Sequence, residues 1–238
     1  MNYALIFAGG TGRRMNSCSK PKQFLALHGK PILLYTLEHF EKHPDIDGII
    51  VVCLRNWIDE LKTLLRRYDI GKVMEIVPGG GTGQESIFNG LKALEGFSED
   101  DDIVLIHDGV RPLINGKLIS ANIGAAKEYG AAITAEPAVE SIVQCPDKQR
   151  IKNVPPRNEM YTAKAPQTFR YEVIWGLYKK ARTDGFLTVD SAHLCSLYHI
   201  EMHLVLSTLN NIKITTPQDY YIFRALYEAM ENQQVFGI

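Results

Sequence analysis

The sequence contains no apolar run that approaches the roughly 20 residues needed to cross a bilayer. Its first apolar run, Ala4 to Ala8, is too short for the core of a secretory signal peptide and has no basic residues before it. The chain also lacks an excess of either charge, since its formal net charge is −1. A broad surface for nucleic acid or membrane is therefore not expected, although a local basic pocket is compatible with this balance. We expect a cytoplasmic protein with no membrane and no nucleic-acid partner.

Cysteine is also scarce, and no two cysteines have metal-binding or redox spacing: they stand at positions 18, 53, 145 and 195. We therefore expect reduced thiols. Two histidine pairs are spaced by four residues, at 39 and 43 and at 199 and 203, but neither belongs to an HExxH motif. The first pair lies near a predicted helix end, where histidine suits the helix dipole. A metal site is not expected at either pair.

The 238 residues contain no internal repeat, low-complexity tract or Pro/Ser-rich linker, and 45% of them are apolar. A single domain with one sizeable core is expected over residues 1–238. In the first half, short apolar runs alternate with amphipathic segments, which predicts parallel strands joined by right-handed helical crossovers. Asn56 is the expected N-cap of the second helix. The predicted strands are 3–7, 48–53, 73–77 and 103–107, and the predicted helices are 31–43, 57–68 and 84–94.

The second half of the sequence is less regular. Residues 138–158 alternate in polarity on both sides of a break at Pro146 and end at Pro155-Pro156, which predicts a two-stranded excursion from the domain. Because an isolated hairpin is marginally stable, we expect this arm to pack against a partner subunit. The other predicted elements are helices at 117–129, at 171–182 and from Pro217 on, and strands at 131–135, 202–207 and 212–215.

The loop after the first strand, Ala8-Gly-Gly-Thr-Gly-Arg-Arg-Met15, has three glycines within four residues. Glycines let the backbone fold tightly with its amides free to face an anion. Four cations follow closely and would neutralise a polyphosphate: Arg13, Arg14, Lys20 and Lys22. The P-loop motif GxxxxGK[ST] is absent, and the dinucleotide motif GxGxxG fails because Met15 occupies the third glycine position. The loop therefore predicts a phosphate site of another kind and disfavours a dinucleotide-dependent oxidoreductase.

Two more loops follow predicted strands, and ligands of open α/β sheets bind at the carboxyl ends of strands. The first, Pro78-Gly-Gly-Gly-Thr-Gly-Gln-Glu-Ser86, leads into a helix. The second begins at Asp108, directly after a buried run, where a carboxylate is well placed to hold Mg²⁺ or substrate hydroxyls. Arg111 on the same loop suits a phosphate or carboxylate partner. His107 is expected to be a packed strand-end residue.

The segment from Gly9 to Met15, followed by Pro21-Lys-Gln-Phe24, resembles the signature of sugar-phosphate cytidylyltransferases, notably the ribitol 5-phosphate and 2-C-methyl-D-erythritol 4-phosphate enzymes. The resemblance covers essentially the whole chain through further blocks: Gly79-Gly80-Gly81 with Ser86, His107 to Pro112, Arg157 to Gln167, and Ile212 to Asp219. It implies an α/β fold with a Rossmann-like, mostly parallel nucleotidyltransferase sheet and a protruding β-arm for dimerisation at 138–158. It also implies transfer of CMP from CTP to a polyol phosphate with release of pyrophosphate.

The resemblance further implies roles for residues at matching positions. The catalytic residues would be Arg14, Lys22 and Lys213. CTP would be bound by Ala8, Gly9, Gly10, Gly12, Gly80, Gly81, Ser86 and Asp108, with Mg²⁺ or another divalent cation at Asp108. The acceptor would be bound by Asp108, Arg111, Ser141, Arg157 and Lys213. In the family, the residues that match Ser141 and Arg157 come from the arm of the neighbouring subunit, so a homodimer with shared active sites is expected.

Two positions depart from the family pattern. Ala165 replaces the usual threonine before Pro-Gln, and Val189 stands where relatives often have aspartate, with Asp190 one place later. Each change removes a group that would bind the acceptor. A CTP-binding module without transfer activity is therefore an alternative function. Lys213 is expected inside a short strand as a buried lysine, which is costly without a partner. Asp219 follows Thr216-Pro217 as a helix-capping residue would, so capping is a better prediction than metal binding.

Details of the matching blocks favour ribitol 5-phosphate as the acceptor. Met160-Tyr161, Val110 and the run from Ile214 to Asp219 are more similar to the ribitol phosphate enzymes. Methylerythritol enzymes more often have Ala-Ala before the arginine and a tryptophan near the tyrosine position. The expected product is CDP-ribitol, with the 2-C-methyl-D-erythritol 4-phosphate reaction of isoprenoid biosynthesis as the alternative.

Overall fold

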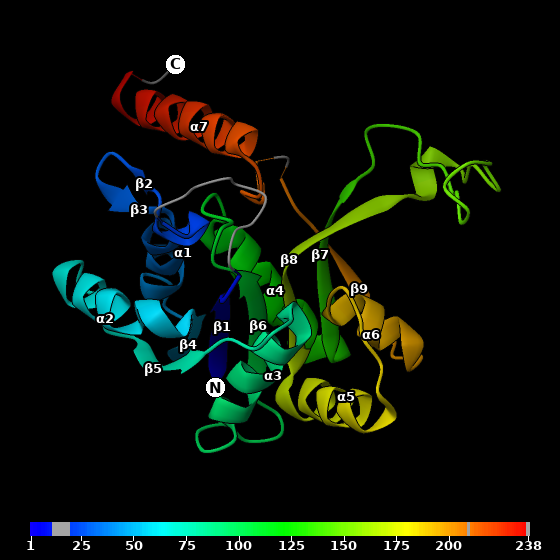
Figure 1. Cartoon of the computed structure of the whole chain (residues 1–238), viewed down its shortest axis with the longest axis horizontal. Coiled ribbons are helices and arrows are strands. Elements are labelled where there is room, and N and C mark those ends of the chain that lie inside the picture. The colour runs from blue at the N-terminus through cyan, green and yellow to red at the C-terminus, as the bar shows by residue number, and fades with distance from the viewer. Residues whose placement is uncertain (11–19, 209, 237–238) are drawn as a thin grey trace.

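The computed structural model describes residues 1–10, 20–208 and 210–236, and the structural statements below refer to these residues. Seven strands form one sheet in the order β5-β4-β1-β6-β8-β7-β9 (Figure 1). They are β1 (Asn2–Ala8), β4 (Gly48–Cys53), β5 (Val73–Pro78), β6 (Ile103–Asp108), β7 (Ala131–Pro137), β8 (Tyr161–Arg170) and β9 (His203–Leu206). All neighbouring strands are parallel except β8, which runs antiparallel to both β6 and β7. The predicted α/β fold with a mostly parallel sheet is confirmed.

Helices cover both faces of this sheet (Figure 1). They are α1 (Ile32–Glu41), α2 (Ile58–Arg67), α3 (Gly83–Leu94), α4 (Gly116–Tyr129), α5 (Tyr171–Asp184), α6 (Ser191–Leu197) and α7 (Pro217–Phe236). A hairpin of β2 (Ala26–Leu27) and β3 (Lys30–Pro31) precedes α1, and 3-10 turns occur at Lys22–Phe24, Arg55–Trp57 and Arg157–Glu159. No helix in the described part of the chain combines the length and apolar character that a membrane crossing requires.

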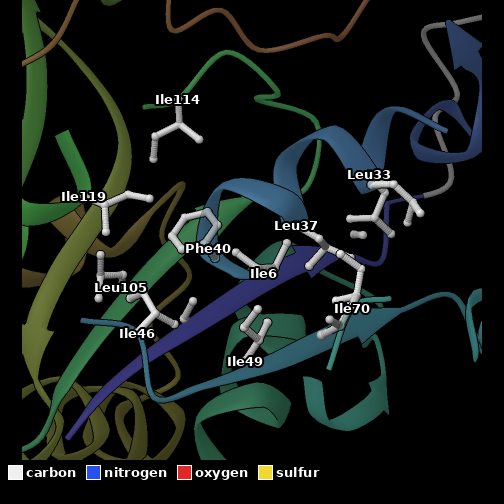
Figure 2. Close-up of a cluster of buried hydrophobic side chains, with 14 of the residues drawn as sticks. Ile6, Leu33, Leu37, Phe40, Ile46, Ile49, Ile70, Leu105, Ile114 and Ile119 are labelled. Atoms are coloured by element: carbon white, nitrogen blue, oxygen red, sulfur yellow. The ribbon is translucent and has the colours of Figure 1, made fainter. Parts of the chain in front are cut away.

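The alternation of strand side chains divides the core into two layers. Ile6 of β1 packs in the layer of α1, α2 and α4, whereas its neighbour Leu5 packs in the layer of α3, α5 and α6. Successive side chains of a strand point to opposite faces, so a strand covered on both faces must be apolar at every position. The side chains of the first layer in Figure 2 include Leu33, Leu37, Phe40, Ile49 and Leu105.

The last helix packs over the β2–β3 hairpin and α1. Phe223 of α7 is fully buried against Tyr35 of α1, with ring centroids 5.6 Å apart. The hydroxyl of Tyr220 donates to the carbonyl of Ala26 at 2.7 Å. Before α7, the N–H of Ile214 donates to the carbonyl of Val110 at 2.9 Å. The chain that leads into α7 is thereby held beside the loop that follows β6.

Residues 138–158 extend away from the sheet between β7 and β8, as Figure 1 shows. Within this arm a single isolated bridge, between Gln144 and Asn153, pairs its two halves, so the predicted two-stranded structure is reduced to that bridge. Several apolar side chains along the arm are exposed: Val139, Ile142, Val143, Ile151 and Val154. The arm therefore buries little apolar surface within its own chain.

Some local predictions are wrong. Asn56 does not cap α2, because it lies within the 3-10 turn and the helix begins after Trp57 without a side-chain cap. Residues 212–215 form no strand, because their backbone contacts the loop after β6 instead of a sheet edge. The sequence prediction also missed β8 and α6. The first has an exposed polar start and contains Pro166, and the second is only seven residues long.

Candidate active site

The carboxyl ends of β1, β4, β5 and β6 border a cleft of about 1060 Å³. Such an edge is where open α/β sheets bind ligands. Two glycine-rich segments form much of its wall, namely 8–10 and 79–83. Single side chains from other segments complete it: Lys22, Gln23, Arg55, Asn56, Trp57, Ser86, Asp108, Val110 and Lys213. Of the predicted CTP-binding residues, Gly12 and the catalytic Arg14 lie outside the described residues, and all the others line this cleft.

The two glycine-rich segments touch each other. A Cβ atom added to Gly79 would lie 3.2 Å from the Cα of Gly9 and 3.2 Å from the Oγ of Ser86. A Cβ on Gly9 would meet the Cα of Gly79 and the same Oγ at 3.3 Å. A side chain at either position would make tight contacts that push the segments apart, so glycine favours this close approach.

The second glycine segment is tied to the N-terminus of α3. Thr82 is the N-cap of this helix, and its Oγ1 accepts from the N–H of Glu85 at 3.1 Å. Glu85 reaches back and accepts from the N–H of Gly81 at 2.6 Å. This arrangement is similar to a capping box, and it holds the positive end of the helix dipole at the cleft. Anions are favoured at such a position.

Ser86 also shapes this segment. Its Oγ accepts from the N–H of Gly80 at 3.1 Å and donates to the carbonyl of Thr82 at 2.9 Å. The residue is 4% exposed, yet it borders the cleft. The hydroxyl therefore fixes the backbone of the loop that faces the cleft.

Gln23 joins the first glycine segment to the basic segment behind it. Its side chain is buried, and Nε2 donates to the carbonyls of Ala8 and Gly10. The neighbouring Lys22 donates from Nζ to the carbonyl of Ile214 at 3.0 Å. Gln23 thus sets the position of Lys22 relative to the glycines. No sequence pattern had pointed to Gln23, although the residue stands inside the Pro21-Lys-Gln-Phe24 block.

Asp108, at the end of β6, is the charged centre of the cleft. It is 5% exposed, and its two oxygens bind different cations. Oδ1 lies 2.5 Å from Nζ of Lys213, and Oδ2 accepts from Nε of Arg111 at 2.8 Å. Burial alone would raise the pKa of Asp108, but Lys213 and Arg111 outweigh it and lower the pKa to about 2. Asp108 is therefore ionised at neutral pH.

The sequence predicted Lys213 as a buried residue of a short strand, and this prediction is wrong. Its side chain is 40% exposed and lies in irregular chain. The partner expected for it is present as Asp108, and Nζ also lies 5.8 Å from the ring centroid of Phe7. A half-exposed lysine with one carboxylate partner keeps further donors for a ligand in the cleft.

Arg111 faces the interior. It is 7% exposed, and besides Asp108 its guanidinium donates through Nη1 to the carbonyl of Asn211 at 2.9 Å. Asn211 in turn donates to the carbonyl of Ala165 at 2.7 Å. In this chain Arg111 holds Asp108 and links it to the segment before α7. A contact of Arg111 with the acceptor stays a prediction.

Ser141 and Arg157 lie on the arm and do not line the cleft of their own chain. Both are exposed, and Arg157 donates from Nη1 to the carbonyl of Val139 at 3.3 Å. A single chain therefore does not bring these two residues to Asp108 and Lys213.

His107 and Asp219 have the structural roles expected of them. His107 is fully buried, and burial lowers its pKa to about 3, so the ring is neutral at physiological pH. Asp219 accepts from the N–H groups of Thr215 and Thr216 at 2.8 and 2.7 Å, which caps the start of α7. Neither residue lines the cleft.

Val189 and Asp190, where the sequence departs from the family pattern, lie at the start of α6. Asp190 is the N-cap of α6, where Oδ1 accepts from the N–H of His193 at 2.8 Å and Oδ2 accepts from Nε2 of Gln167 at 3.2 Å. Val189 is 89% exposed. The hydroxyl of Thr188 is buried without a hydrogen-bond partner among the described residues. The carboxylate at 190 is thus committed to the start of a helix.

Three residues of the 3-10 turn after β4, Arg55, Asn56 and Trp57, also line the cleft without having been predicted there. Trp57 stacks on Phe24, with ring centroids 4.5 Å apart. The general rule that strand ends meet at one edge would have indicated it.

The cleft combines glycine backbone, a helix N-terminus and the cations Lys22 and Lys213 around one ionised carboxylate. Preorganised cations and amides of this kind stabilise negative charge on phosphates. Among the described residues, no three His, Cys, Asp or Glu side chains are grouped as a metal centre. The hydroxyl of Ser86 is bound within its own loop and is therefore not poised as a nucleophile. The arrangement suits binding and transfer of a phosphate group.

Comparison with protein families matches residues 3–229 to the model of IspD, 2-C-methyl-D-erythritol 4-phosphate cytidylyltransferase. Two curated relatives are ribitol-5-phosphate cytidylyltransferases. The one from Vibrio parahaemolyticus is 49% identical over 238 residues, and the one from Streptococcus agalactiae is 47% identical over 239. Both alignments cover 100% of each chain.

Among solved structures, the crystal structure of 4-diphosphocytidyl-2C-methyl-D-erythritol synthase from Anaerococcus prevotii superimposes with a TM-score of 0.84. It is 31% identical in sequence, and the match covers 95% of this chain and 96% of that one. The similarity in fold therefore extends over nearly the whole of both molecules.

Proposed function

The chain belongs to the IspD family of cytidylyltransferases, and from this membership we propose that it transfers CMP from CTP to D-ribitol 5-phosphate, forming CDP-ribitol and releasing pyrophosphate. One observation carries the choice of acceptor. Identity over the whole of both chains is 47–49% with relatives named for ribitol 5-phosphate, against 36–37% with curated relatives named for 2-C-methyl-D-erythritol 4-phosphate. The methylerythritol phosphate reaction is the second candidate, because the family model bears that name.

The proposed reaction is a displacement at the α-phosphorus of CTP. An oxygen of the acceptor phosphate forms a bond to this phosphorus, the bond to the bridging oxygen of the β-phosphate breaks, and pyrophosphate leaves with the electron pair. The acceptor phosphate is already anionic near pH 7, so no general base is required. The obstacle is repulsion between two polyanions. Catalysis therefore depends on positioning and on fixed positive charge.

The cations of the cleft meet this requirement. Lys22 and Lys213 reach it from two segments far apart in the chain. Lys22 contacts the carbonyl of Ile214, and Lys213 contacts Asp108. These contacts hold the two ammonium groups in position for the phosphates of the substrates. Arg14 is proposed as a third cation on the basis of its place in the family motif. CTP would lie along the glycine segments, with backbone amides as donors to the nucleotide.

Asp108 is the residue of the cleft that fits a divalent cation. It is ionised, and it is the sole carboxylate among the described residues that line the cleft. Magnesium is commonly held by one or two carboxylates together with substrate phosphates and water, so a single protein ligand suffices. When bound, Mg²⁺ would neutralise charge on the phosphates. Lys213 would then shift its contact from Asp108 towards the substrate.

The acceptor pocket would be completed by a second copy of the chain. The arm carries Ser141 and Arg157 away from the cleft of its own chain and exposes apolar side chains along its length. Exposed apolar surface of this kind is typical of an interface. We propose a homodimer in which each arm supplies Ser141 and Arg157 to the cleft of the other subunit.

Pyrophosphate release tests the reaction and the acceptor together. The protein is incubated with CTP and Mg²⁺, and with ribitol 5-phosphate or 2-C-methyl-D-erythritol 4-phosphate in parallel. We expect release that depends on ribitol 5-phosphate and a product with the mass of CDP-ribitol. Release with the methylerythritol compound alone would move the chain to the second candidate. CTP binding without release in either reaction would contradict the proposed transfer and favour a silent module, with Ala165 and Val189 as the first positions to restore.

A further inference from the structure

The chain between β6 and α4 is irregular but buried. Every residue from 109 to 114 is buried, although none of them belongs to a helix or strand. Backbone carbonyls in such a place must find hydrogen-bond donors, because an unpaired buried polar group costs free energy. The donors cannot come from a regular ladder, so side chains and irregular backbone of neighbouring segments must supply them.

Helix α1 supplies two of these donors, and the turn after it makes a third contact of the same kind with the first residue of α4. Thr36 donates from Oγ1 to the carbonyl of Gly109 at 3.1 Å, and Nε2 of His39 lies 3.1 Å from the carbonyl of Pro112. Nε2 of His43 lies 3.2 Å from the carbonyl of Gly116 and 3.0 Å from Oγ of Ser120. Each pair is separated by 73 positions, so helix and loop run side by side in the same direction.

The spacing of the three donors explains their alignment. Positions 36, 39 and 43 are three and four residues apart and therefore share one face of the helical turn. A carbonyl oxygen only accepts, so each Nε2 must carry the hydrogen. For His43, Nδ1 accepts from the N–H of Asp45 at 3.2 Å, which fixes this tautomer. Burial lowers the pKa of His39 and so favours its neutral form.

The backbone of this loop also lies directly against the helix. A Cβ atom on Gly109 would come within 2.8 Å of Cδ1 of Leu33 and 3.0 Å of Cβ of Ala8. From the sheet side, His107 donates through Nε2 to the carbonyl of Arg111 at 3.3 Å. The loop is therefore clamped between α1 and the end of β6.

These contacts of Thr36, His39 and His107 with the loop, here called the clamp, bear on the charged centre of the cleft. The N–H of Arg111 donates to the carbonyl of Asp108 at 3.1 Å, and its side chain pairs with the carboxylate. The carbonyl of Val110 accepts from the N–H of Ile214, next to Lys213. A shift of the loop would therefore displace the carboxylate and the lysine together.

We propose that Thr36 and His39 of α1 are positioning residues for Asp108, acting through the backbone of the loop from Gly109 to Pro112. The inference rests on the proposed function for its catalytic consequence. A displacement on the order of 1 Å at a reacting centre costs up to about a hundredfold in rate. The two residues do not line the cleft, and they set the place of the carboxylate that does.

The test uses pairs of variants that differ in one donor. Thr36→Val keeps the branched shape and removes the hydroxyl, whereas Thr36→Ser restores the donor. His39→Leu removes the second donor, and His39→Gln keeps a terminal N–H. The control is Thr134→Val in β7, because Thr134 is equally buried and its Oγ1 bonds with Asn122 at a site that does not line the cleft. It loses a buried hydrogen bond without touching the loop.

Two kinds of measurement are made on the 238-residue chain: amide hydrogen exchange of Gly109, Val110 and Arg111, since Pro112 has no N–H, and kcat with KM for CTP. We expect Thr36→Val and His39→Leu to speed exchange in the loop and to lower kcat about tenfold or more with little change in KM. Thr36→Ser and His39→Gln recover most of both. Thr134→Val lowers thermal stability but leaves loop exchange and kcat close to wild type.

Unchanged loop exchange in Thr36→Val and His39→Leu would overturn the inference, whether or not turnover is detected. Faster exchange with unaltered kcat would also overturn it, because the clamp would then serve stability alone. A wild-type protein that is inactive with every acceptor contradicts the proposed function instead. In that case the loop exchange and the mobility of the Asp108 carboxylate, read from its side-chain resonance in NMR, still decide whether α1 positions Asp108.

Discussion

Nζ of Lys213 lies 2.5 Å from Oδ1 of Asp108, and the two residues come from irregular chain before the last helix and from the end of a central strand. The carboxylate is almost fully buried, whereas the lysine is 40% exposed. Asp108 therefore orients Lys213 at the wall of the cleft while the ammonium group keeps access to a ligand. Because Asp108 is also paired with Arg111, its charge would remain compensated if Lys213 turned to a substrate phosphate in the proposed reaction.

Asp108→Asn should lower both activity and stability. At neutral pH the change leaves Arg111 buried without its carboxylate, which costs roughly 3–5 kcal/mol in such pairs. The pKa of Asp108 in the folded state, about 2, lies below its ordinary value of 3.8. The stabilisation is therefore complete above about pH 4 and is lost as the pH falls towards 2. Urea unfolding of wild type and variant between about pH 7 and pH 2.5 should show a stability difference that narrows below about pH 4.

The variant Asp59→Asn on α2 is the control for this experiment, because the side chain of Asp59 is exposed and forms a surface pair with Lys62. Its difference from wild type should be small at every pH. A constant gap between wild type and Asp108→Asn down to about pH 2.5 would contradict the role of the buried charge.

Lys22→Ala should lower kcat by about two decades or more, as expected when a cation that stabilises transition-state charge is removed. The fold should survive, because the hydrogen bond of Lys22 to Ile214 goes to a carbonyl outside the sheet. Lys62→Ala on the surface of α2 is the matched control and should leave kcat unchanged. Steady-state pyrophosphate release and a thermal melt report the two effects separately. Near wild-type turnover of Lys22→Ala would remove Lys22 from the catalytic set.

Arg157→Glu should abolish use of the acceptor while CTP still binds. The charge reversal places a carboxylate where an acceptor phosphate is proposed to bind, and the cleft of the nucleotide is untouched. Arg150→Glu on the same arm is the control, since Arg150 is exposed and pairs with Asp147. CTP titration by calorimetry and KM for the acceptor separate the two halves of the site. Loss of CTP affinity in Arg157→Glu would contradict this division.

Shared sites predict rescue on mixing. Co-expression of Arg157→Glu with Lys213→Met gives heterodimers in which one cleft carries both changes and the other carries neither. Activity should therefore return in the mixture, although each variant alone is inactive. Absence of recovery in purified heterodimers, together with a monomeric mass of the wild type in solution, would rule out the exchange of arms.

Gly80→Ala should weaken CTP binding by distorting the second glycine segment. A Cβ atom at Gly80 would lie 2.3 Å from Cβ of Glu85, so Glu85 and its bond to the N–H of Gly81 must move. Gly124→Ala in α4 is the control, because a Cβ atom added at Gly124 would have no atom within 4 Å and alanine favours a helix. Isothermal titration should show weaker CTP binding for Gly80→Ala alone. Unchanged affinity of Gly80→Ala for CTP would contradict this prediction, because the segment would then accommodate a Cβ atom at position 80 without loss of binding.

Much of the site followed from the sequence because strand ends in a parallel sheet converge. Glycines after the first and third predicted strands and a carboxylate after the fourth were expected at one edge, and they line one cleft. The role of Lys213 came from the family resemblance. Its predicted place in a strand is wrong, although isoleucines on both sides of a lysine are a period-two pattern that favours a strand. In the folded chain Ile214 packs against α7 and the β6 loop instead.

The residues that escaped prediction act through the backbone of other segments. Gln23 donates to the carbonyls of Ala8 and Gly10, and Asn211 donates to that of Ala165. Such contacts leave no periodic trace in a sequence, because any donor of suitable length can meet a carbonyl. His39 shows the same limitation. Its spacing from His43 only raises the question of a metal site, whereas in the fold its Nε2 contacts the carbonyl of Pro112.

By itself the sequence determined the alternating α/β architecture, the order of the first strands along the chain and the glycine and charge content of the loops, because these depend on local periodicity and on residue type. The tertiary structure alone decided that β8 runs antiparallel between β6 and β7, that Arg111 turns inward to Asp108, and that α1 clamps the loop carrying them. Those features depend on which buried carbonyls and charges find partners across the folded chain, and pairing of that kind is set by packing in three dimensions.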